Sequence, residues 1–389
     1  MRHRLISLRS ATFFMRAAHV FISMPVGGAE DIVLSLARTE HPGLEIMPVC
    51  LRELGVAGEE AVATGTPVTL LDAAPRKRFS PTGVWKLSRW LKEQRIDVVH
   101  SHVYNAHVYA VLAARLAGLP VVMHHHKTFN RARRRRWLTL RLLSKLTAAQ
   151  ITLSEQTRED IITALRVQRE ITHVMTNTVD TRQFMPHADR AALRRSLGLP
   201  EDGLIIGGVA SLSAQKNHSA TIRLMQGMKK VVPTCQGMIF GEGMMRPTLE
   251  SEIAASQTGD VLRLMGNKRP IAPWMQALDV LLLPSTWEGQ PMVLLQGLAC
   301  GVPMVASDIE GNVATLGTDH PGLFKLGDDA DYLEKTRLCL TDAAFRSHVL
   351  KHQEATWAAQ PKMADYDRQL AELYASLPVA TRHSRPLSA

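Results

Sequence analysis

The sequence predicts an α/β protein with two doubly wound domains, in which helices cover both faces of a mainly parallel sheet. Three observations support this prediction. Short apolar runs alternate with amphipathic stretches, the alternation is repeated in both halves of the chain, and a segment rich in turn formers separates the halves. The chain has 389 residues, of which 46% are hydrophobic and 21% charged, which is enough for two separate cores.

The apolar runs have the length of buried parallel strands. They read AAHVFIS, IDVVHSH, PVVMHHH and AQITLSE in the first half, and LIIGGVASL, QGMIFGE, DVLLLPS and PMVASD in the second. Turn formers concentrate in residues 177–186. We therefore expect an N-terminal domain over residues 16–182 and a C-terminal domain over residues 183–360, followed by a tail over residues 361–389.

Residues 1–15 are basic and weakly patterned, so we expect them to lie outside the first domain, with Met15 as an alternative start. No stretch approaches the roughly 20 apolar residues that span a bilayer, and no signal-peptide pattern opens the chain. These features favour a cytoplasmic protein. The four cysteines lie far apart without the spacing of a zinc site, which favours buried reduced thiols.

The formal charge of +10 belongs to the first half of the chain. Residues 1–187 contain 26 Lys and Arg against 15 Asp and Glu, whereas residues 188–389 contain 20 against 21. This asymmetry indicates an anionic partner for the first half, which could be a membrane surface, a phosphorylated acceptor or a nucleic acid.

The segment LLLPSTWEGQPMVLLQGLACGVPMVASD, residues 281–308, carries the strongest functional signal. An apolar run ends at Pro284, a polar loop follows, apolar residues recur at helical spacing, and Gly301 precedes a second apolar run. The pattern predicts strand, loop, helix, turn and strand. Glu288 and Gly289 precede the helix N-terminus, where backbone N–H groups and the helix dipole favour an anion such as a phosphorylated ligand.

The same residues resemble the donor-sugar site of retaining GT-B glycosyltransferases, in particular those of glycosyltransferase family 4. The resemblance covers P-S-x-x-E-G-x-P and A-C-G-x-P-x-V-A-S-D, with Glu288 as the first acid of the family's pair. Gln296 stands where the family usually has the second acid. Residues 177–186 are similar to the family's crossing into the second domain, with Thr178 in place of the usual Gly.

The resemblance implies two Rossmann-like domains that face each other across a cleft, and a helix near Asp365–Ser376 that crosses back to the first domain. It also implies a nucleotide-diphosphate-sugar donor, UDP- or GDP-linked, and transfer with retention of configuration. The acceptor would be a glycan or a lipid-linked molecule of surface polysaccharide or lipopolysaccharide synthesis. Neither a cofactor nor a metal ion is expected.

Residues of the second half match the family's donor-binding motifs. By resemblance, Lys216 neutralises the donor diphosphate, whereas Ser211 replaces the usual Arg of that motif and brings no charge. Arg246, Lys268 and Arg269 are candidates to compensate for this loss. Further expected donor-binding residues are Gly241, Asn267, Lys268, Glu288, Gly289, Gln290, Pro291, Met292 and Gln296. Among these, Glu288 would bind hydroxyls of the sugar and Gln296 those of the ribose.

Two further groups of expected site residues lie at strand ends of the first half. Gly27 and Gly28, in the family's G-G-A-E, would face the donor diphosphate. His126, matched through P-V-V-x-x-x-H, would contact the donor sugar near the reacting carbon, while His102 and Asn105 would lie on the acceptor side. Consecutive histidines 124–126 also suggest a metal site, but adjacent strand residues point to opposite faces and cannot all bind one ion.

A basic segment with Arg133, Arg134, Arg135 and Arg136 begins an amphipathic helix. Leu138, Leu140, Leu142, Leu143 and Leu146 supply its apolar face. Such a helix can lie on an anionic membrane, which would place the protein on the inner face of the cell membrane. Nucleic acid is not expected as a partner, since no aromatic interleaving or known module accompanies the charges.

The sequence allows two alternatives to an active transferase. A nicotinamide dehydrogenase shares the alternating pattern, but Pro25–Glu30 lacks the G-x-G-x-x-G spacing that binds a dinucleotide. A catalytically degenerate GT-B scaffold is the second alternative, because Ser211 and Gln296 both depart from the family's pattern.

Overall fold

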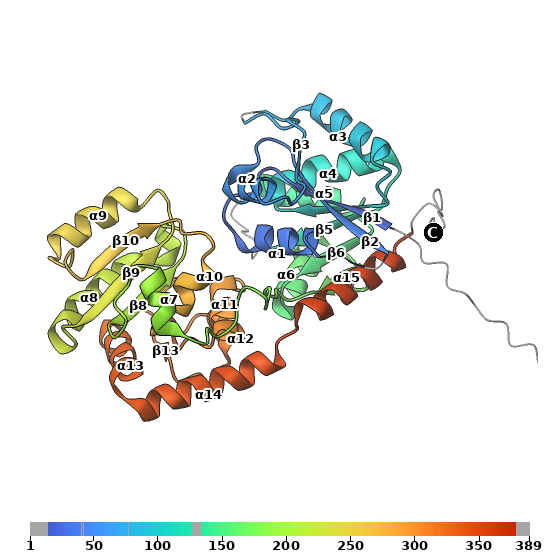
Figure 1. Cartoon of the computed structure of the whole chain (residues 1–389). Helices are drawn as coiled ribbons and strands as arrows, with labels where there is room; N and C mark the ends of the chain where they lie inside the picture. The colour runs from blue at the N-terminus through green and yellow to red at the C-terminus, as the bar shows by residue number, and fades with distance from the viewer. Residues whose placement is uncertain (1–14, 40, 42, 77, 127–133, 379–389) are drawn as a thin grey trace, which may run out of the picture. The chain divides into compact units, whose positions relative to one another are not determined.

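The computed structural model describes residues 15–378, apart from residues 40, 42, 77 and 127–133. The chain forms two compact units (Figure 1). Of the described residues, those up to 176 and those from 364 to 378 form unit 1, and those from 177 to 363 form unit 2. The chain thus passes between the units at Asn177 and again after Met363, rather than at residues 182/183 and 360/361.

Unit 1 is built on a parallel sheet with the strand order β3-β2-β1-β4-β5-β6-β7. Its strands are β1 (Met15–Phe21), β2 (Leu44–Cys50), β3 (Thr69–Leu70), β4 (Val98–His102), β5 (Val121–His125), β6 (Ala149–Thr152) and β7 (Thr172–Val174). The chain builds outward in one direction from β1 and in the other from β4. Ligands of such sheets bind beyond the carboxyl ends of the two strands where the order reverses, here β1 and β4.

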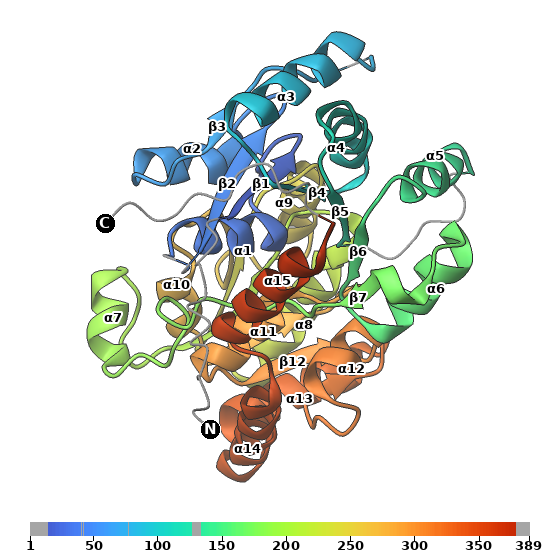
Figure 2. The same ribbon diagram turned by 90° about the vertical axis from the view of Figure 1, so that its right-hand side faces the viewer.

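The helices of unit 1 are α1 (Gly28–Ala37), α2 (Gly55–Ala63), α3 (Pro81–Glu93), α4 (Tyr104–Ala117), α5 (Arg134–Ser144), α6 (Glu155–Leu165) and α15 (Met363–Ser376), with a short 3-10 turn η1 (Arg169–Ile171). α5 packs against α4 and α6 (Figure 2). α15 buries Tyr366, Leu370, Leu373 and Tyr374, the spacing of one helical face. The predicted C-terminal helix that returns to the first domain is therefore confirmed.

Unit 2 has a second parallel sheet with the order β10-β9-β8-β11-β12-β13. Its strands are β8 (Leu204–Val209), β9 (Cys235–Phe240), β10 (Leu262–Gly266), β11 (Val280–Leu283), β12 (Met304–Ser307) and β13 (Leu323–Phe324). Its helices are α7 (Arg190–Ser196), α8 (His218–Val231), α9 (Arg246–Ala255), α10 (Ala272–Gln276), α11 (Met292–Cys300), α12 (Glu310–Leu316), α13 (Asp329–Thr341) and α14 (Ala343–Ala359), with a short 3-10 turn η2 (Ala214–Lys216).

Both faces of the unit 2 sheet are covered, as the unbroken apolar run of β11 predicts. Leu281 and Leu283 lie in one core cluster with the residues of α11, whereas Val280 and Leu282 lie in the other with those of α8 and α13. Gly301, with a φ of 65°, ends α11 in the left-handed conformation that favours glycine. The predicted strand, loop, helix, turn and strand are thus all present between residues 280 and 307.

Among the described residues, no helix is both long and apolar enough to cross a membrane. All four cysteines are buried and free, as expected. Burial raises the thiol pKa of each of them to about 12, so they are protonated at neutral pH.

Candidate functional site

Glu288 and Lys216 form an ion pair in unit 2. Lys216 Nζ lies 2.5 Å from Glu288 Oε1, and the two side chains are 17% and 7% exposed. Ser285 Oγ donates to the same carboxylate oxygen at 2.6 Å, and Gln215 Nε2 donates to the other at 3.4 Å. The predicted sugar-binding acid and the predicted phosphate-binding cation are therefore direct neighbours.

Two loops hold this pair, one after β8 and one after β11. β8 and β11 are adjacent strands at which the order of the unit 2 sheet reverses. The Thr286 N–H donates to the Gln215 carbonyl at 2.9 Å, and Asn217 Nδ2 donates to the Pro284 carbonyl at 3.1 Å. Asn217 itself has a φ of 50°, a left-handed conformation that Asn tolerates better than most residues. These bonds join the loops and fix the two charged side chains opposite one another.

Three glycines allow the backbones around this pair to approach closely. A Cβ on Gly241 or Gly243 would lie 2.0 Å from the Ala210 carbonyl oxygen or 2.3 Å from that of Leu212. A Cβ on Gly311, in α12, would lie 2.6 Å from the Glu288 carbonyl oxygen. Sequence reasoning identified Gly241 as part of the nucleotide pocket but missed Gly311, because nothing in the local pattern shows that α12 passes the loop of Glu288.

Ser211, which replaces the expected Arg, is exposed, and its Oγ lies 3.3 Å from Ser213 Oγ. Arg246, a candidate to compensate for the lost charge, pairs with Glu242 at 2.7 Å and with Glu250 at 2.9 Å. The hydrogen bonds that the guanidinium donates to these carboxylates raise its pKa further above the usual value. Two carboxylates therefore already neutralise the charge of Arg246.

The remaining predicted donor-binding residues of unit 2 lie on several elements. Lys268 Nζ lies 5.3 Å from the centroid of the Trp274 ring, a cation–π distance, and Asn267 beside it is exposed. Gln290 Oε1 accepts from the Asn177 N–H at 2.7 Å. Further along, Pro291 is the N-cap of α11, Met292 is its first residue, and Gln296 is a buried residue of the same helix.

In unit 1, Gly27 is the N-cap of α1 and Gly28 its first residue, directly after the loop that follows β1. A Cβ on Gly27 would lie 2.4 Å from Glu30 Oε2, so the Glu30 side chain folds back over this glycine. The glycine pair therefore lies at a helix N-terminus, at the edge of the sheet where β1 and β4 end.

Five histidines and one tyrosine meet at this edge of the unit 1 sheet. His19 comes from β1, His100 and His102 from β4, His124 from β5, His126 from the residue after β5, and Tyr374 from α15. Register places His19 beside His100 and His102 beside His124. We call these six residues the histidine cluster. Sequence reasoning gave roles to His102 and His126 and considered His124 only as a potential metal ligand. It did not predict that the six side chains meet, because their proximity depends on strand register and packing.

Four of the five histidine rings of the cluster, all but His126, are buried, and several of the rings stack on one another. The centroids of His100 and His102 lie 4.6 Å apart with an interplanar angle of 6°, and those of His124 and His126 lie 3.9 Å apart. Burial, reinforced by neighbouring imidazoles, lowers the pKa of His19 to about 3 and that of His100, His102 and His124 well below the usual value. These four rings are therefore neutral at pH 7.

The structure also tests the interpretation of the three consecutive histidines. His125 points to the opposite face of β5, where its Nε2 lies 2.9 Å from Gln150 Oε1, so residues 124–126 do not converge, as predicted. Across strands, however, His19, His100 and His102 form one group of potential metal ligands, and His102, His124 and His126 form another. In each group the ligand atoms lie within 4.8 Å of one another.

The turn between β4 and α4 is strained. Val103, directly after His102, has a φ of 60° and a ψ of 158°, which a β-branched residue rarely adopts. Asn105, expected on the acceptor side, is exposed in the first turn of α4. The Arg136 guanidinium lies 4.9 Å from the ring centroid of the neighbouring Tyr104.

The prediction that the leucines of the basic helix form a single apolar face is wrong. In α5, Leu140 and Leu143 are 7% and 6% exposed and pack into the unit 1 core, whereas Leu138 and Leu142 are 52% and 65% exposed. Leu146, just beyond α5, is also exposed. The leucines divide between two faces because α4 and α6 cover only one of them. Arg133 and the side chain of Arg134 lie outside the described residues.

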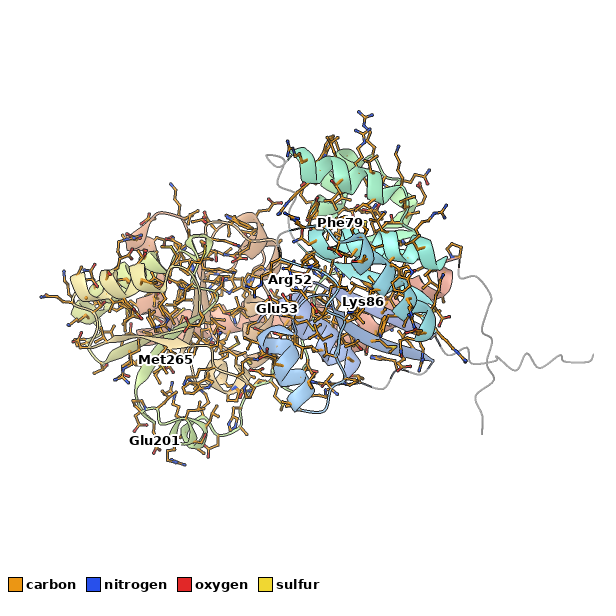
Figure 3. The ribbon with its side chains drawn as sticks, turned by 90° about the horizontal axis from the view of Figure 1, so that it is seen from above. Arg52, Glu53, Phe79, Lys86, Glu201 and Met265 are labelled. Carbon is orange, nitrogen blue, oxygen red and sulfur yellow. The ribbon has the colours of Figure 1, made fainter. Side chains whose placement is uncertain are left out.

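Unit 1 also contains an open cavity of about 710 Å³ beside α3. Its walls include Trp85, Lys86 and Arg89, and the Arg89 guanidinium lies 5.7 Å from the centroid of Trp85. Lys86 is labelled in Figure 3, together with Phe79 from the segment before α3. None of the predicted site residues lines this cavity.

Comparison with solved structures defines the class of protein. The crystal structure of Anabaena HepE in complex with UDP-glucose matches with a TM-score of 0.79 and 20% identity, covering 93% of this chain and 100% of that one. At this identity the likeness is one of fold. Two Rossmann-like α/β units with parallel sheets of this form are the GT-B fold of glycosyltransferases, as predicted.

Sequence models of two families match successive parts of the chain. The family described as Glycosyltransferase Family 4 matches residues 26–183, and the family Glycosyl transferases group 1 matches residues 189–355. The protein belongs to the group 1 glycosyltransferases of family 4 type, and it is a glycosyltransferase.

Two related proteins match most of the chain. The Escherichia coli UDP-Gal:α-D-GlcNAc-diphosphoundecaprenol α-1,3-galactosyltransferase is 26% identical over 359 residues, which cover 86% of this chain and 90% of the relative. The putative glycosyltransferase EpsF of Bacillus subtilis is 29% identical over 304 residues, which cover 75% and 79% of the two chains.

Proposed function

We propose that this glycosyltransferase moves a hexose from a UDP-sugar to a lipid-linked glycan acceptor, with retention of the anomeric configuration and without a bound metal ion. The E. coli relative is named for UDP-galactose and a diphosphoundecaprenol-linked acceptor, and HepE was solved with UDP-glucose. The product would serve the synthesis of a surface polysaccharide or lipopolysaccharide.

The Lys216–Glu288 pair is the observation that carries the proposal. Departure of the nucleotide develops negative charge on the leaving diphosphate, and a fixed cation at that point lowers the barrier. The Lys216 ammonium supplies such a charge from the protein itself. Glu288 is an acceptor for the sugar hydroxyls, and the bonds from Ser285 and Gln215 hold its orientation before the donor arrives.

The other groups would complete the donor site. The backbone N–H groups of Gly289, Gln290 and Met292 and of Gly27 and Gly28 lie at helix N-termini, where they can bind phosphate oxygens. The leaving phosphate would take the proton of the acceptor hydroxyl on the same face of the sugar, which gives retention. His126 would contact the sugar near the reacting carbon, with His102 and Asn105 toward the acceptor.

An exposed face of α5 supports attachment to the inner face of the cell membrane. Leu138 and Leu142 are exposed on the same helix as Arg135, and Lys145 and Leu146 continue this face. Leucines that enter the headgroup region and cations that attract anionic lipids act together at such a surface. A lipid-linked acceptor would then meet the enzyme at the membrane.

Nucleotide titration tests the proposed donor. Isothermal calorimetry with UDP, GDP and UDP-hexoses should show binding by UDP and its conjugates, and NMR of the product should show the donor's anomeric configuration. Chelation by EDTA should leave turnover unchanged. Absence of UDP binding at millimolar concentration contradicts the proposal, as does an inverted product.

Glu288→Gln separates catalysis from binding, with Glu201→Gln as the control because Glu201 is an exposed partner of Arg195 in the same unit. We expect Glu288→Gln to lower turnover about 10²-fold or more, as for loss of one preorganised polar contact, while Glu201→Gln matches wild type. UDP binding without turnover in the wild-type protein would instead favour the degenerate scaffold, to which Ser211 and Gln296 are relevant.

A further inference from the structure

Hydrogen bonds between described residues link the histidine cluster into one chain. His124 Nδ1 lies 3.3 Å from His100 Nε2, and His100 Nδ1 lies 2.5 Å from the Tyr374 hydroxyl. That hydroxyl lies 3.0 Å from His19 Nε2. His19 Nδ1 lies 3.0 Å from His102 Nε2, and His102 Nδ1 lies 2.8 Å from His126 Nε2. The chain thus joins three neighbouring strands and α15.

The two ends of the chain differ. At the inner end, His124 Nε2 is buried and has no hydrogen-bond partner among the residues that the structure describes. At the outer end, His126 is partly exposed. Each neutral imidazole carries one N–H and one lone pair, and the tyrosine carries one hydrogen. The direction in which all these hydrogens point is therefore a property of the chain as a whole.

In only one direction does every buried hydrogen of these bonds have an acceptor. If the bonds run from His126 inward, the last hydrogen lies on His124 Nε2, which has no acceptor. If His100 and His19 both donate to the Tyr374 hydroxyl oxygen, the buried hydroxyl hydrogen of Tyr374 has no acceptor. If the bonds run from His124 outward, the inner end leaves only a bare lone pair. An orphaned buried donor is rarer in proteins than an under-satisfied acceptor.

We infer that the chain runs outward from His124 to His126, so that His102 is a positioning residue that donates to His126 Nε2 and fixes the hydrogen of His126 on Nδ1. In this direction all five histidines carry their hydrogen on Nδ1. This is a sharp expectation, because a histidine side chain in water prefers the Nε2–H form.

The geometry of these rings fits a bound metal ion less well than it fits a chain of hydrogen bonds. Three imidazoles can bind zinc only when their lone pairs point to a common centre. Here the ring planes are inclined by only 19° for His102 with His126, 26° for His124 with His126 and 39° for His102 with His124. The nitrogens of His102 and His126 face each other at hydrogen-bonding distance instead.

The inferred tautomer has a consequence for catalysis that rests on the proposed function. With its hydrogen on Nδ1 and its Nε2 lone pair occupied by His102, His126 can only donate to a ligand. His126 would then hold a sugar oxygen by donating a hydrogen bond and would not act as a general base. This agrees with a mechanism in which the leaving phosphate takes the acceptor proton.

NMR of the full-length protein with histidine-selective 15N labelling tests the inference at pH 8 without donor or turnover, so its result is independent of the proposed function. Protonated and bare ring nitrogens have well-separated shifts. We expect protonated Nδ1 and bare Nε2 for His126 and the four other histidines. A hydrogen on Nε2 of His126 overturns the inference, as does displacement of the ring hydrogens by stoichiometric Zn²⁺.

Two variants test the role of His102. His102→Phe keeps a ring that can stack on Phe21 but removes the donor to His126, so the Nε2–H form of His126 should rise at least several-fold. His125→Phe is the control, because it removes a buried imidazole from the opposite face of β5. An unchanged tautomer in a folded His102→Phe protein, or an equal change in the control, contradicts the inference. If His102→Phe does not fold, the wild-type spectrum still decides.

Discussion

Both units present polar side chains at the carboxyl ends of a parallel sheet, but they differ in the kind of polarity. Unit 1 gathers neutral imidazoles, which are stacked, buried and hydrogen-bonded to one another. Unit 2 instead pairs opposite charges there, with Lys216 against Glu288. The comparison shows that one sheet topology can support two kinds of electrostatic environment, because the side chains at the strand ends set the local charge while the backbone sets only their positions.

The largest expected effect of this difference is on the stability of the two units at acidic pH. Among the described residues, unit 1 buries six histidines with lowered pKa values, namely His19, His100, His102, His107, His124 and His125. In unit 2 the described buried histidines with lowered values are His218 and His320. In the unfolded chain these groups bind protons near pH 6.5, and in the folded protein only at lower pH. Their stabilisation is therefore complete above pH 6.5 and is lost as the pH falls toward 4.

Each such histidine contributes a slope of about 1.4 kcal/mol per pH unit inside this window. Unit 1 should consequently unfold at a higher pH than unit 2, which hydrogen exchange with mass spectrometry can resolve peptide by peptide. His125→Gln should flatten the slope for unit 1 alone. Earlier loss of protection in unit 2 would show that the histidines do not control acid stability.

Removing the charge of Lys216 should have the next largest effect. Lys216→Met eliminates the charge opposite Glu288, and we expect kcat to fall about 10²–10³-fold, the usual cost of one preorganised group that stabilises the leaving charge. Lys229→Met is the matched control, because Lys229 also pairs with a carboxylate, Asp260, on the surface of the same unit. Equal kinetics for the two variants would remove Lys216 from the mechanism.

Gly311→Ala tests whether close backbone contact holds the loop of Glu288. The added Cβ would overlap the Gly289 carbonyl oxygen at 2.5 Å, so we expect the free energy of unfolding of unit 2 to fall by about 1–3 kcal/mol and UDP affinity to fall with it. In Gly259→Ala, by contrast, the nearest atom lies at 3.7 Å. Calorimetry and urea unfolding measure both quantities. A Gly311→Ala protein as stable as Gly259→Ala would refute the contact.

The smallest effect is expected at the exposed face of α5. Leu138→Ser together with Leu142→Ser should lower sedimentation with anionic liposomes by up to about tenfold for each leucine, the scale of one partly buried apolar side chain. Leu116→Ser, at a 58% exposed position of α4, is the control. Loss of binding in the control alone would move the membrane surface away from α5.

Much of the architecture could be predicted from the pattern of the chain. The eight apolar runs correspond to β1, β4, β5, β6, β8, β9, β11 and β12, and the GT-B fold and the return of α15 were both expected. The runs missed β2, β3, β7, β10 and β13. Of these, β3 and β13 have only two residues, too few to show a period, and β2 contains Pro48, which argues locally against a strand.

The residues at the sites were predicted one by one, but their contacts were not. Glu288 and Lys216 were each singled out by motif, yet nothing in the sequence showed that they form a pair, because they are brought together by the adjacency of β8 and β11. Arg246 looked like a spare cation, although Glu242 and Glu250 already neutralise it. The roles of these residues toward a donor stay predictions.

The local sequence pattern was sufficient to predict the class of fold, the strand-to-helix motif around Glu288 and the candidate site residues. These features depend on residues that are close in the chain. Tertiary structure alone decided the ion pair, the division of the α5 leucines and the chain from His124 to His126. Each of these depends on strand order, register or packing between elements far apart in sequence. Tyr374 shows this most clearly, because it meets His100 across 274 residues of sequence separation.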